Sequence, residues 1–356
     1  MVRTVLVFTP CMLCSPLLLL PYSVCPTSTL LDLLAWSMET AGPVYIKLSQ
    51  WASTRRDIFP SVVCSRLARL QRDTTPHTWG QTRVVLDREW GEDWKEVVQL
   101  DRKVVGSGCC AQVYRGRLVR DDRDVAVKVV HPGLARQLEL DLLVMSTAAG
   151  LISWMVPGVE WLSLEKAVEE FRELMVGQVD MRQEARNLVK FRENFRDNTR
   201  VFFPEPLEEL CGSSVLVEDW VEGVGIQVYM DQSGGEGEVV RKELAELGVE
   251  MLLKMVFTDN YWHGDLHPGN LIVTKGNRLC VLDTGIASSL GTEDRDNLVH
   301  TFKAVVLGES CKVGELFLER SYHECLDKEA FVRDMQDIVE KARGAQLSLD
   351  RWVVVK

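Results

Sequence analysis

The residues of this sequence best suited to chemistry lie in one short loop and just after the segment that follows it. Residues 263–270 read HGDLHPGN, and Asp283 opens a D-x-G triplet further on. Phosphoryl transfer depends on charge neutralisation and alignment more than on covalent chemistry. Asp265 would orient the acceptor group, while Asn270 and Asp283 offer the hard oxygen ligands that Mg²⁺ prefers. The spacing therefore predicts a site for a metal ion and a phosphate-bearing ligand.

Each of these residues has a simpler interpretation when it is taken alone. An aspartate before a Pro-Gly pair is usually a turn residue, and a lone histidine is usually a structural group. The combination of D-x₄-N, a predicted hairpin and D-x-G is far less common, and it favours phosphate handling. His267 is expected to orient its neighbours and not to act in catalysis.

A basic candidate lies upstream in a predicted strand. Lys128 follows Val-Ala-Val and precedes two further valines. Its ammonium can reach the α- and β-phosphates of a nucleotide while its neighbours fill a core. A lysine on a solvated strand face is the alternative, and the downstream aspartates weigh against it. Its carboxylate partner should come from a helix, and Glu184 is the candidate.

A glycine-rich segment precedes Lys128 by one hairpin. Residues 106–113 read GSGCCAQV, which has GxG but carries alanine in place of the third glycine of GxGxxG. Small residues allow backbone N–H groups to approach phosphate oxygens. Such a segment is more often only a tight turn, but its position favours a nucleotide-covering loop. The predicted nucleotide contacts here are Gly106, Gly108, Ala111 and Gln112.

The composition limits the class of protein. The chain has 356 residues, of which 46% are hydrophobic and 26% charged, and this suits a globular protein of two lobes. A net charge of −11 argues against a nucleic-acid partner, which would require a basic surface. The ten cysteines show no disulfide framework, and Cys11 and Cys14 lack a second pair for zinc. Reduced thiols in an intracellular compartment are expected.

The amino-terminal part begins with an apolar stretch. Residues 5–22 contain no charged residue, but 18 residues barely reach the length that spans a bilayer. The prolines Pro10, Pro16 and Pro21 weaken a straight helix. The sequence leaves open a membrane helix, a signal-like segment or a hydrophobic hairpin.

The remaining pattern predicts an α+β, bilobal, protein-kinase-like fold, with a small antiparallel sheet followed by a helical lobe. The predicted helices cover 30–72, 83–100, 133–198 and 239–258; strands are expected within 104–130 and 214–221, a flexible loop at 231–238, and a hairpin at 271–283. The predicted domains are an apolar segment (1–28), a helical extension (29–100), an N-lobe with inserted helices (101–225) and a C-lobe (226–356).

The predicted amino-terminal helix carries a polar stripe that introduces a family resemblance. Lys47, Gln50, Thr54 and Asp57 would share one helix face. Residues 47–60 resemble the KxGQxxSxRxDxxP signature of the UbiB (aarF/ABC1) family of atypical kinases. The matching positions are Lys47, Gln50, Ser53, Arg55, Asp57 and Pro60. With the strand of Lys128 and the DxHPGN loop, the resemblance covers roughly residues 41–283. The sequences of these motifs are similar to those of a branch of the family that is mitochondrial in animals.

The resemblance implies ATP and Mg²⁺ as cofactors and a helix that covers the nucleotide cleft with Lys47 and Gln50. It implies ATP hydrolysis or small-molecule or lipid phosphotransfer, with protein phosphorylation doubtful. It further implies a mitochondrial location at the inner membrane in support of coenzyme Q metabolism. The implied partners are ATP, membrane lipids or quinone intermediates, and coenzyme Q biosynthesis proteins. The choice of Glu184 among many acidic residues also rests partly on this resemblance.

The sequence departs from the family pattern at several positions. Ser49 replaces the glycine of KxGQ, Gln178 replaces a frequent acidic residue, and Thr284 replaces the phenylalanine of DFG. The HGD triplet lacks the arginine of HRD, and no Ala-Pro-Glu follows, so a peptide-substrate platform is expected to be absent. Two alternatives stay open: a small-molecule kinase of the aminoglycoside or choline type, and a lipid- or partner-binding pseudokinase.

Overall fold

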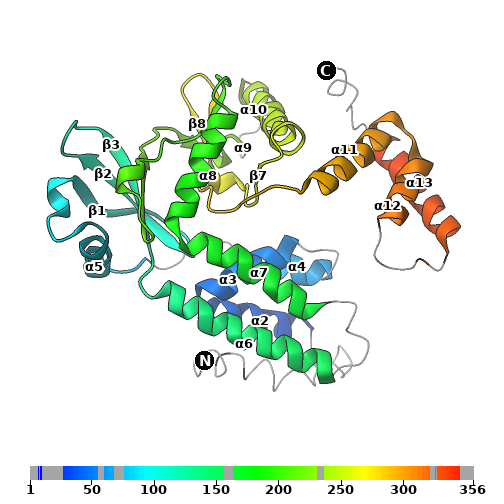
Figure 1. Cartoon of the computed structure of the whole chain (residues 1–356), viewed down its shortest axis with the longest axis horizontal. Helices are drawn as coiled ribbons and strands as arrows, with labels where there is room; N and C mark the ends of the chain where they lie inside the picture. Colours follow the sequence, from blue (N-terminus) through cyan, green and yellow to red (C-terminus); the bar gives the residue numbers. More distant parts are fainter. Residues whose placement is uncertain are drawn as a thin grey trace. The chain divides into compact units, whose positions relative to one another are not determined.

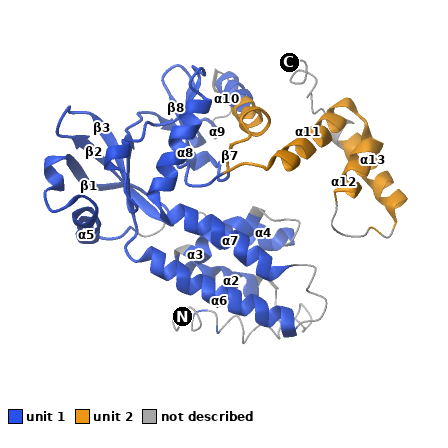
Figure 2. Ribbon diagram, viewed as in Figure 1, with its two compact units in different colours: residues 1–247, 264–287 blue, residues 248–263, 288–356 orange. Residues whose placement is uncertain are grey.

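The computed structural model describes residues 27–54, 60–67, 76–155, 163–230, 236–320 and 327–344, together with Val7, Thr9 and Cys325. The chain divides into two compact units (Figure 2), residues 1–247 with 264–287, and residues 248–263 with 288–356. Most of the apolar amino-terminal stretch, including Cys11 and Cys14, lies outside the described residues, as do Arg55 and Asp57.

An antiparallel sheet of four strands organises the first unit (Figure 1). Its order is β1-β2-β3-β5, and the strands are β1 (Val98–Ser107), β2 (Ala111–Leu118), β3 (Asp124–Val130) and β5 (Val215–Asp219). Because side chains alternate along a strand, the valines 125, 127 and 129 of β3 enter the core on one face. Ala126 and Lys128 therefore lie on the opposite face. This sheet confirms the predicted strands.

Helix α5 (Trp79–Trp90) packs against the core face of this sheet through Leu86. The prediction of one helix over 83–100 is wrong in its second half. Gly91 ends α5 with φ 85°, and its N–H donates to the carbonyl of Asp87. A 3-10 turn at Trp94–Glu96 follows, and Val98 then opens β1 fully buried, because its side chain completes the sheet core.

Helix α8 (Met181–Asn194) lies beside the opposite face of the sheet (Figure 1). Asp180 caps it by accepting a hydrogen bond from the N–H of Arg182, and the N–H of Met181 donates to the carbonyl of Ser213 at 3.0 Å. The predicted helical region 133–198 comprises α6 (Leu134–Met155), α7 (Leu164–Val179) and α8.

Three further helices, α2 (Thr27–Ala41), α3 (Pro43–Thr54) and α4 (Ser61–Leu67), account for the described part of the predicted helical region 30–72. The ring of Trp51 on α3 packs against Phe171 on α7, with centroids 6.3 Å apart. Among the described helices, α6 is long and apolar enough to cross a membrane, with a mean hydropathy of 1.4, although this finding concerns length and composition alone.

A second sheet has the order β4-β9-β8-β6. It consists of β4 (Val201–Phe202), β6 (Val224–Gly225), β8 (Leu271–Thr274) and β9 (Arg278–Val281). Strands β8 and β9 form the predicted hairpin, with Gly276 at φ 77° and Asn277 at φ 54° in the turn. The backbone N–H of Leu282 donates to the carbonyl of Asn270 at 2.8 Å, so the hairpin closes at its base.

The other elements are short connections and the helices toward the carboxyl end. They are α9 (Gln227–Met230), α10 (Glu236–Leu253) with a π-helical turn at Lys254–Thr258, β7 (Trp262–His263), β10 (Ala287–Ser288), α11 (Thr292–Leu307), α12 (Ser310–Glu319) and α13 (Lys328–Gly344). The last three residues of the predicted loop 231–238 are helical in α10. Helices α11 to α13 pack around Ala304, Val313 and Val339.

The packing of α8 gives a stability prediction. Phe191 is fully buried, and its ring stacks on Phe203 with centroids 4.9 Å apart. The substitution Phe191→Ala should lower the free energy of unfolding by about 3–5 kcal/mol, because it removes a buried ring and leaves a cavity. Urea unfolding measures this loss. Val189→Ala on the same helix, where Val189 is 40% exposed, should change it by about 0.5 kcal/mol or less.

Candidate nucleotide and metal site

A cavity of about 1310 Å³ in the first unit gathers most of the predicted site residues. It is lined by side chains and backbone from α3, the glycine-rich turn, β3, α8, the end of β5 and residues 265–285. The predicted residues along it are Lys47, Gln50, Gly106, Gly108, Ala111, Lys128, Glu184, Asp265, Asn270 and Asp283.

Gln112 does not line this cavity. It shares a face of β2 with Tyr114 and is fully buried in the core. Its amide accepts a hydrogen bond from the backbone N–H of His77 at 2.9 Å and donates to the carbonyl of His77 at 3.2 Å. Ala111 and Val113, one residue before and after it, face the cavity. Strand alternation therefore separates Gln112 from the predicted nucleotide contacts.

The centre of the cavity is an ammonium shared by two carboxylates. Lys128 Nζ lies 2.8 and 2.9 Å from the two oxygens of Glu184 and 3.2 Å from Oδ1 of Asp283. Burial alone would lower the pKa of Lys128, but Asp283 and Glu184 outweigh it and raise that pKa. Burial raises the pKa of Glu184 to about 7. The Lys128 ammonium therefore stays charged. Glu184, whose pKa is raised by burial, loses its negative charge more easily than an exposed glutamate does.

Two hydrogen bonds tie α8 to the segment that carries Asp283. Asn187 Nδ2 donates to the carbonyl of Thr284 at 2.7 Å, and the hydroxyl of Thr284 donates to the carbonyl of Glu184 at 3.3 Å. Both Asn187 and Thr284 are buried. Thr284, a departure from the family pattern, thus helps to hold Asp283 beside Lys128. Sequence reasoning missed Asn187, because nothing in the spacing of the helix predicts its partner.

Asp265 is paired with a lysine from the amino-terminal helix. Lys47 Nζ forms an ion pair with Oδ2 of Asp265, and Lys47 is buried. Burial would lower the pKa of Lys47, but Cys109 and Asp265 raise it. Ser49, two residues on, turns away from the cavity and donates to the carbonyl of Tyr45 at 2.7 Å. The Ser49 side chain, which replaces the glycine of the family pattern, therefore packs between α3 and α2, where it also contacts Met38.

Asn270 lies beside Asp265 at the start of the hairpin. Its Nδ2 donates to the backbone carbonyl of Asp265 at 3.0 Å, which leaves the amide oxygen as its group suited to a cation. His267 Nδ1 accepts a hydrogen bond from the N–H of Gly269 at 3.1 Å. A Cβ at Gly269 would approach the His267 ring to 2.8 Å, so a side chain at this position would force that ring to move.

Glu218 on β5 is a cavity residue that the sequence reasoning did not single out. Burial raises its pKa to about 8, so it holds a proton at neutral pH. Its Oε2 is buried and has no hydrogen-bond partner among the described residues. It pairs in register with Ala126, on the same face as Lys128. An acidic residue at an inward position of the predicted strand 214–221 is the signal that could have identified it.

The glycine-rich turn is anchored by His131, another residue that sequence reasoning missed. The N–H of Gly108 donates to the carbonyl of Ala111 at 2.9 Å, and the N–H of His131 donates to the carbonyl of Cys110 at 2.9 Å. The ring Nε2 of His131 lies 2.9 Å from the carbonyl of Gly108. Gln178, on α7, lines the same cavity.

The oxygen atoms of Asn270 and Asp283 fit a metal ion whose remaining ligands come from phosphate groups. Among the described residues, no three or more His, Cys, Asp or Glu side chains form a ready-made metal centre. Mg²⁺ usually takes one or two carboxylates together with phosphate oxygens and water. Asn270 and Asp283 supply that kind of partial set. The unpartnered oxygen of Glu218 separately fits a hydrogen-bonding group of a ligand in the same cavity.

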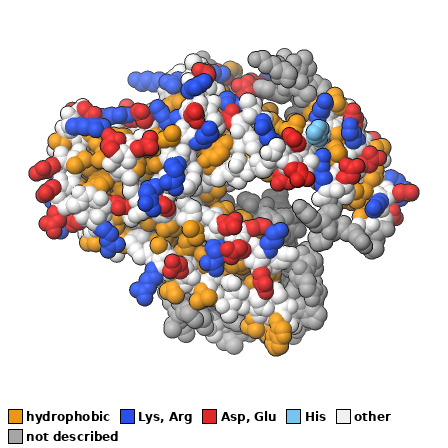
Figure 3. All heavy atoms as spheres, viewed as in Figure 1, with side chains coloured by type: hydrophobic (Ala, Val, Ile, Leu, Met, Phe, Trp, Pro, Cys, Tyr) orange, Lys and Arg blue, Asp and Glu red, His pale blue; other side chains and the backbone are white. Residues whose placement is uncertain are grey.

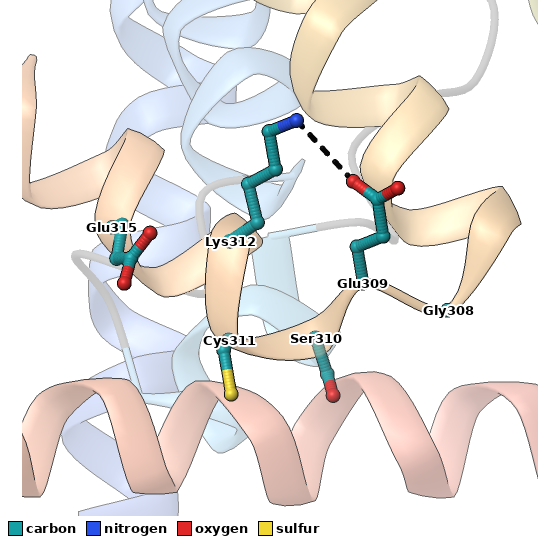
Figure 4. A pocket seen from close by; sticks show the side chains of 6 residues that line it. All are labelled: Gly308, Glu309, Ser310, Cys311, Lys312 and Glu315. Carbon is teal, nitrogen blue, oxygen red and sulfur yellow. Dashed lines mark ion pairs between the residues drawn. The ribbon is translucent and has the colours of Figure 1, made fainter.

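A smaller hollow in the second unit has fewer features of a binding site. It has a volume of about 390 Å³ and is formed by Gly308 to Lys312 and Glu315 (Figure 4). Its one ion pair joins Lys312 and Glu309 at 3.4 Å, and both side chains are largely exposed. On the face seen in Figure 3, acidic and basic side chains are intermingled.

The shared ammonium gives a pH-dependent prediction. Lys128→Met should destabilise the chain by about 3–5 kcal/mol near pH 8, because it leaves Glu184 buried without its partner. Without the ammonium, the folded-state pKa of Glu184 rises further above its unfolded value of about 4.3. A raised carboxyl pKa costs stability as pH rises, so the loss should be smaller at about pH 5.

Urea unfolding at the two pH values measures this difference. The matched control is Lys190→Met on α8, the helix that carries Glu184, because Lys190 forms an exposed ion pair with Glu193 at 3.0 Å. Its effect should stay near 0.5 kcal/mol or less at both pH values. An equal loss for Lys128→Met at both would contradict the burial of an unpaired Glu184.

Comparisons with known proteins show likenesses in sequence and in fold. Residues 69–317 match the sequence model of the ABC1 atypical kinase-like domain. A mitochondrial ABC1 family protein of Saccharomyces cerevisiae is 30% identical over 89% of this chain and 58% of its own length. A mitochondrial relative from Schizosaccharomyces pombe is 29% identical over 90% of this chain and 56% of its own. The UbiB protein of Vibrio cholerae, named a probable protein kinase, is 30% identical over 82% and 54%.

The chain thus spans a little over half the length of these curated relatives. A solved structure, that of Rv3197 with erythromycin from Mycobacterium tuberculosis, has a TM-score of 0.57 and 21% identity, and covers 83% of this chain and 74% of that one. This likeness supports the predicted kinase-like α+β fold, with an antiparallel sheet followed by a mostly helical region. By its match to the ABC1 domain over residues 69–317, the chain belongs to the ABC1 (UbiB) family of atypical kinase-like proteins.

Proposed function

We propose that this chain binds ATP with Mg²⁺ in the cavity of its first unit and hydrolyses it slowly, or transfers its terminal phosphoryl group to a small molecule or lipid. The observation that carries the proposal is the Lys128 ammonium between Glu184 and Asp283, with Asn270 across the base of the same hairpin. This arrangement supports the proposal because phosphate binding requires a positive charge beside oxygen atoms that could hold a metal ion.

Each residue has a defined part in this proposal. Lys128 would bind the α- and β-phosphates, and Glu184 would hold its ammonium in position. Asn270 and Asp283 would hold the metal ion, which when bound neutralises phosphate charge. Asp265 would orient the attacking water or hydroxyl. The backbone at Gly106, Gly108 and Ala111 would cover the phosphates, since all three line the cavity.

The pairing of Lys47 with Asp265 favours slow turnover. The carboxylate that would orient an acceptor is already bound by a buried ammonium. An acceptor that uses Oδ2 of Asp265 would have to displace Lys47 before that oxygen can accept its proton. Because Lys47 and Gln50 both line the cavity, α3 would occupy room that a bulky peptide needs beside Asp265. Water or a small hydroxyl group is therefore the favoured acceptor, and protein phosphorylation is disfavoured.

The proposed setting is the mitochondrion, at the inner membrane. Two relatives are named mitochondrial ABC1 family proteins, which supports the location. The resemblance to the UbiB family supports a role in coenzyme Q metabolism, with membrane lipids, quinone intermediates or coenzyme Q biosynthesis proteins as partners. The finer placement that we propose is the branch of aarF-domain-containing kinase 2.

The metal assignment gives one prediction. MgATP at about 100 times its Kd should stabilise the wild type by about 2.7 kcal/mol. Asp283→Asn should remove most of the Mg²⁺-dependent part of this gain, measured by thermal unfolding with ATP in the presence and absence of Mg²⁺. Asp283 has φ 51°, a left-handed conformation that asparagine tolerates.

Asp122→Asn is the matched control for this substitution. Asp122 also has a positive φ, of 60°, and its exposed side chain lies in the turn between β2 and β3. The control should respond to MgATP as the wild type does. If Asp283→Asn keeps the full Mg²⁺-dependent gain, Asp283 is not a metal ligand.

The catalytic assignment gives a second prediction. Asp265→Asn should lower ATP hydrolysis by at least about a hundredfold while nucleotide binding persists, because it removes a proton acceptor. Phosphate release is measured with vesicles of phosphatidylcholine, with and without cardiolipin. Equal rates for wild type and variant would contradict the role of Asp265. If the wild type binds MgATP but hydrolyses it under none of these conditions, a pseudokinase is favoured. The Lys47–Asp265 pair also fits that alternative.

A further inference from the structure

Two adjacent cysteines occupy the glycine-rich turn of the cavity. Cys109 and Cys110 both line it, and their sulfur atoms lie 3.6 Å apart. Cys110 is buried and its Sγ lies 3.9 Å from Oε1 of Gln178, whereas Cys109 is only half-buried. The proposed nucleotide binding assigns no role to either sulfur.

The backbone holds the two thiols in place. Gly108 and Ala111 close the turn by a hydrogen bond of 2.9 Å, and His131 binds the carbonyls of Gly108 and Cys110. The turn begins at the end of β1 and leads into β2, so both of its ends are fixed in the sheet. Cys109 is therefore presented to the cavity from a defined position.

The surroundings of Cys109 favour the reactive form of its thiol. A hydrogen bond from Cys110 lowers the pKa of Cys109, and the nearby ammonium of Lys47 lowers it further, against burial and the charges of Asp283 and Asp265. The same hydrogen bond raises the pKa of Cys110, which stays a thiol donor. The thiolate, not the thiol, is the nucleophile in cysteine chemistry.

Other described cysteines lack this combination. Burial raises the pKa of Cys211 to about 11 and raises that of Cys280 still more. Cys64 is buried between helices, where its Sγ lies 3.7 Å from the carbonyl of Ala52. Cys311 is exposed on α12 in the second unit and is drawn in Figure 4. The contrast makes Cys311 a useful reference for an accessible thiol.

We propose that Cys109 is a covalent modification site for small disulfides and other soft electrophiles, and that the attached group and a nucleotide exclude each other from the cavity. In the disulfide reaction the Cys109 thiolate attacks one sulfur of R–S–S–R. The S–S bond breaks, R–S⁻ leaves and takes up a proton, and Cys109 is oxidised to Cys109–S–S–R. A free thiol reverses the step. The exclusion of nucleotide rests on the proposed function, whereas the modification itself does not.

Cys110 acts as a positioning residue and not as a disulfide partner. The Cα atoms of adjacent residues are about 3.8 Å apart across a trans peptide. Ordinary disulfides join Cα atoms about 4.4–6.8 Å apart, so a bond between neighbours is strained. The reaction therefore stops at the mixed disulfide. The Cys110 thiol, whose sulfur lies 3.6 Å from that of Cys109, would turn its single S–H from Gln178 toward the Cys109 sulfur before attack.

The test is labelling of the full chain with iodoacetamide and, separately, with glutathione disulfide, followed by peptide mass mapping. Cys109 should react at least as fast as the more exposed Cys311. MgATP at about ten times its Kd should slow Cys109 about tenfold, because only the unbound fraction reacts, and should leave Cys311 unchanged. The proposal would be overturned if Cys109 stays unmodified while Cys311 reacts. It would also be overturned if thermal unfolding shows that MgATP is bound and the labelling rate of Cys109 does not change.

Failure of the proposed function is distinguishable in the same experiment. If thermal unfolding detects no bound nucleotide, that function fails, and the labelling rate of Cys109 without nucleotide still decides the modification site. If glutathione disulfide treatment removes the MgATP-induced stabilisation of the wild type but not that of Cys109→Ser, each compared with its own untreated sample, mutual exclusion is supported. Equal losses in both proteins would refute it.

Two variants of Cys110 test its positioning role. Cys110→Ala should slow the labelling of Cys109 several-fold, and Cys110→Ser, which keeps a donor, should restore most of the rate. The melting temperature of each variant shows whether the fold is intact. Labelling of Cys109 that is as fast in Cys110→Ala as in the wild type would contradict this role. A product that has lost two hydrogens across residues 109 and 110 would show a disulfide instead.

Discussion

The first unit is organised around the ammonium of Lys128, which two carboxylates share. Lys128 lies within 3.2 Å of carboxylate oxygens from Glu184 and Asp283, which come from a helix and from the segment after a hairpin. A carboxylate cannot stay charged in a buried site without such compensation. Three segments far apart in the sequence are thus held together by charge. A phosphate-bearing ligand would meet a site whose charges are already positioned.

The surrounding elements follow from what this contact requires. Strand alternation turns Lys128 away from the core that Val127 fills on the other face of β3. The cap at Asp180 fixes the start of α8, one turn before Glu184. The β8–β9 hairpin returns the chain so that Leu282, next to Asp283, hydrogen-bonds to Asn270. Each of these is a local device, and together they set the spacing of the cavity.

Local patterns explain what could be predicted from the sequence. The valines around Lys128 predict a strand, and the turn at Gly276 predicts the hairpin, because both depend on neighbouring residues. Tertiary contacts decided the rest. Gln112 enters the core because Tyr114 shares its face of β2, and residues beyond Gly91 join the sheet and leave the helix. An acidic residue within the predicted strand 214–221 is a signal for Glu218, but its place on the face of Lys128 depends on the pairing of β5 with β3.

The most direct test of this account is a crystal structure with a non-hydrolysable ATP analogue and Mn²⁺, whose anomalous scattering locates the metal. The account predicts a peak about 2.0–2.3 Å from a carboxylate oxygen of Asp283 and from the amide oxygen of Asn270, with the phosphates against Lys128. A metal peak away from both residues, or a nucleotide bound outside the cavity that Lys128 lines, would contradict it.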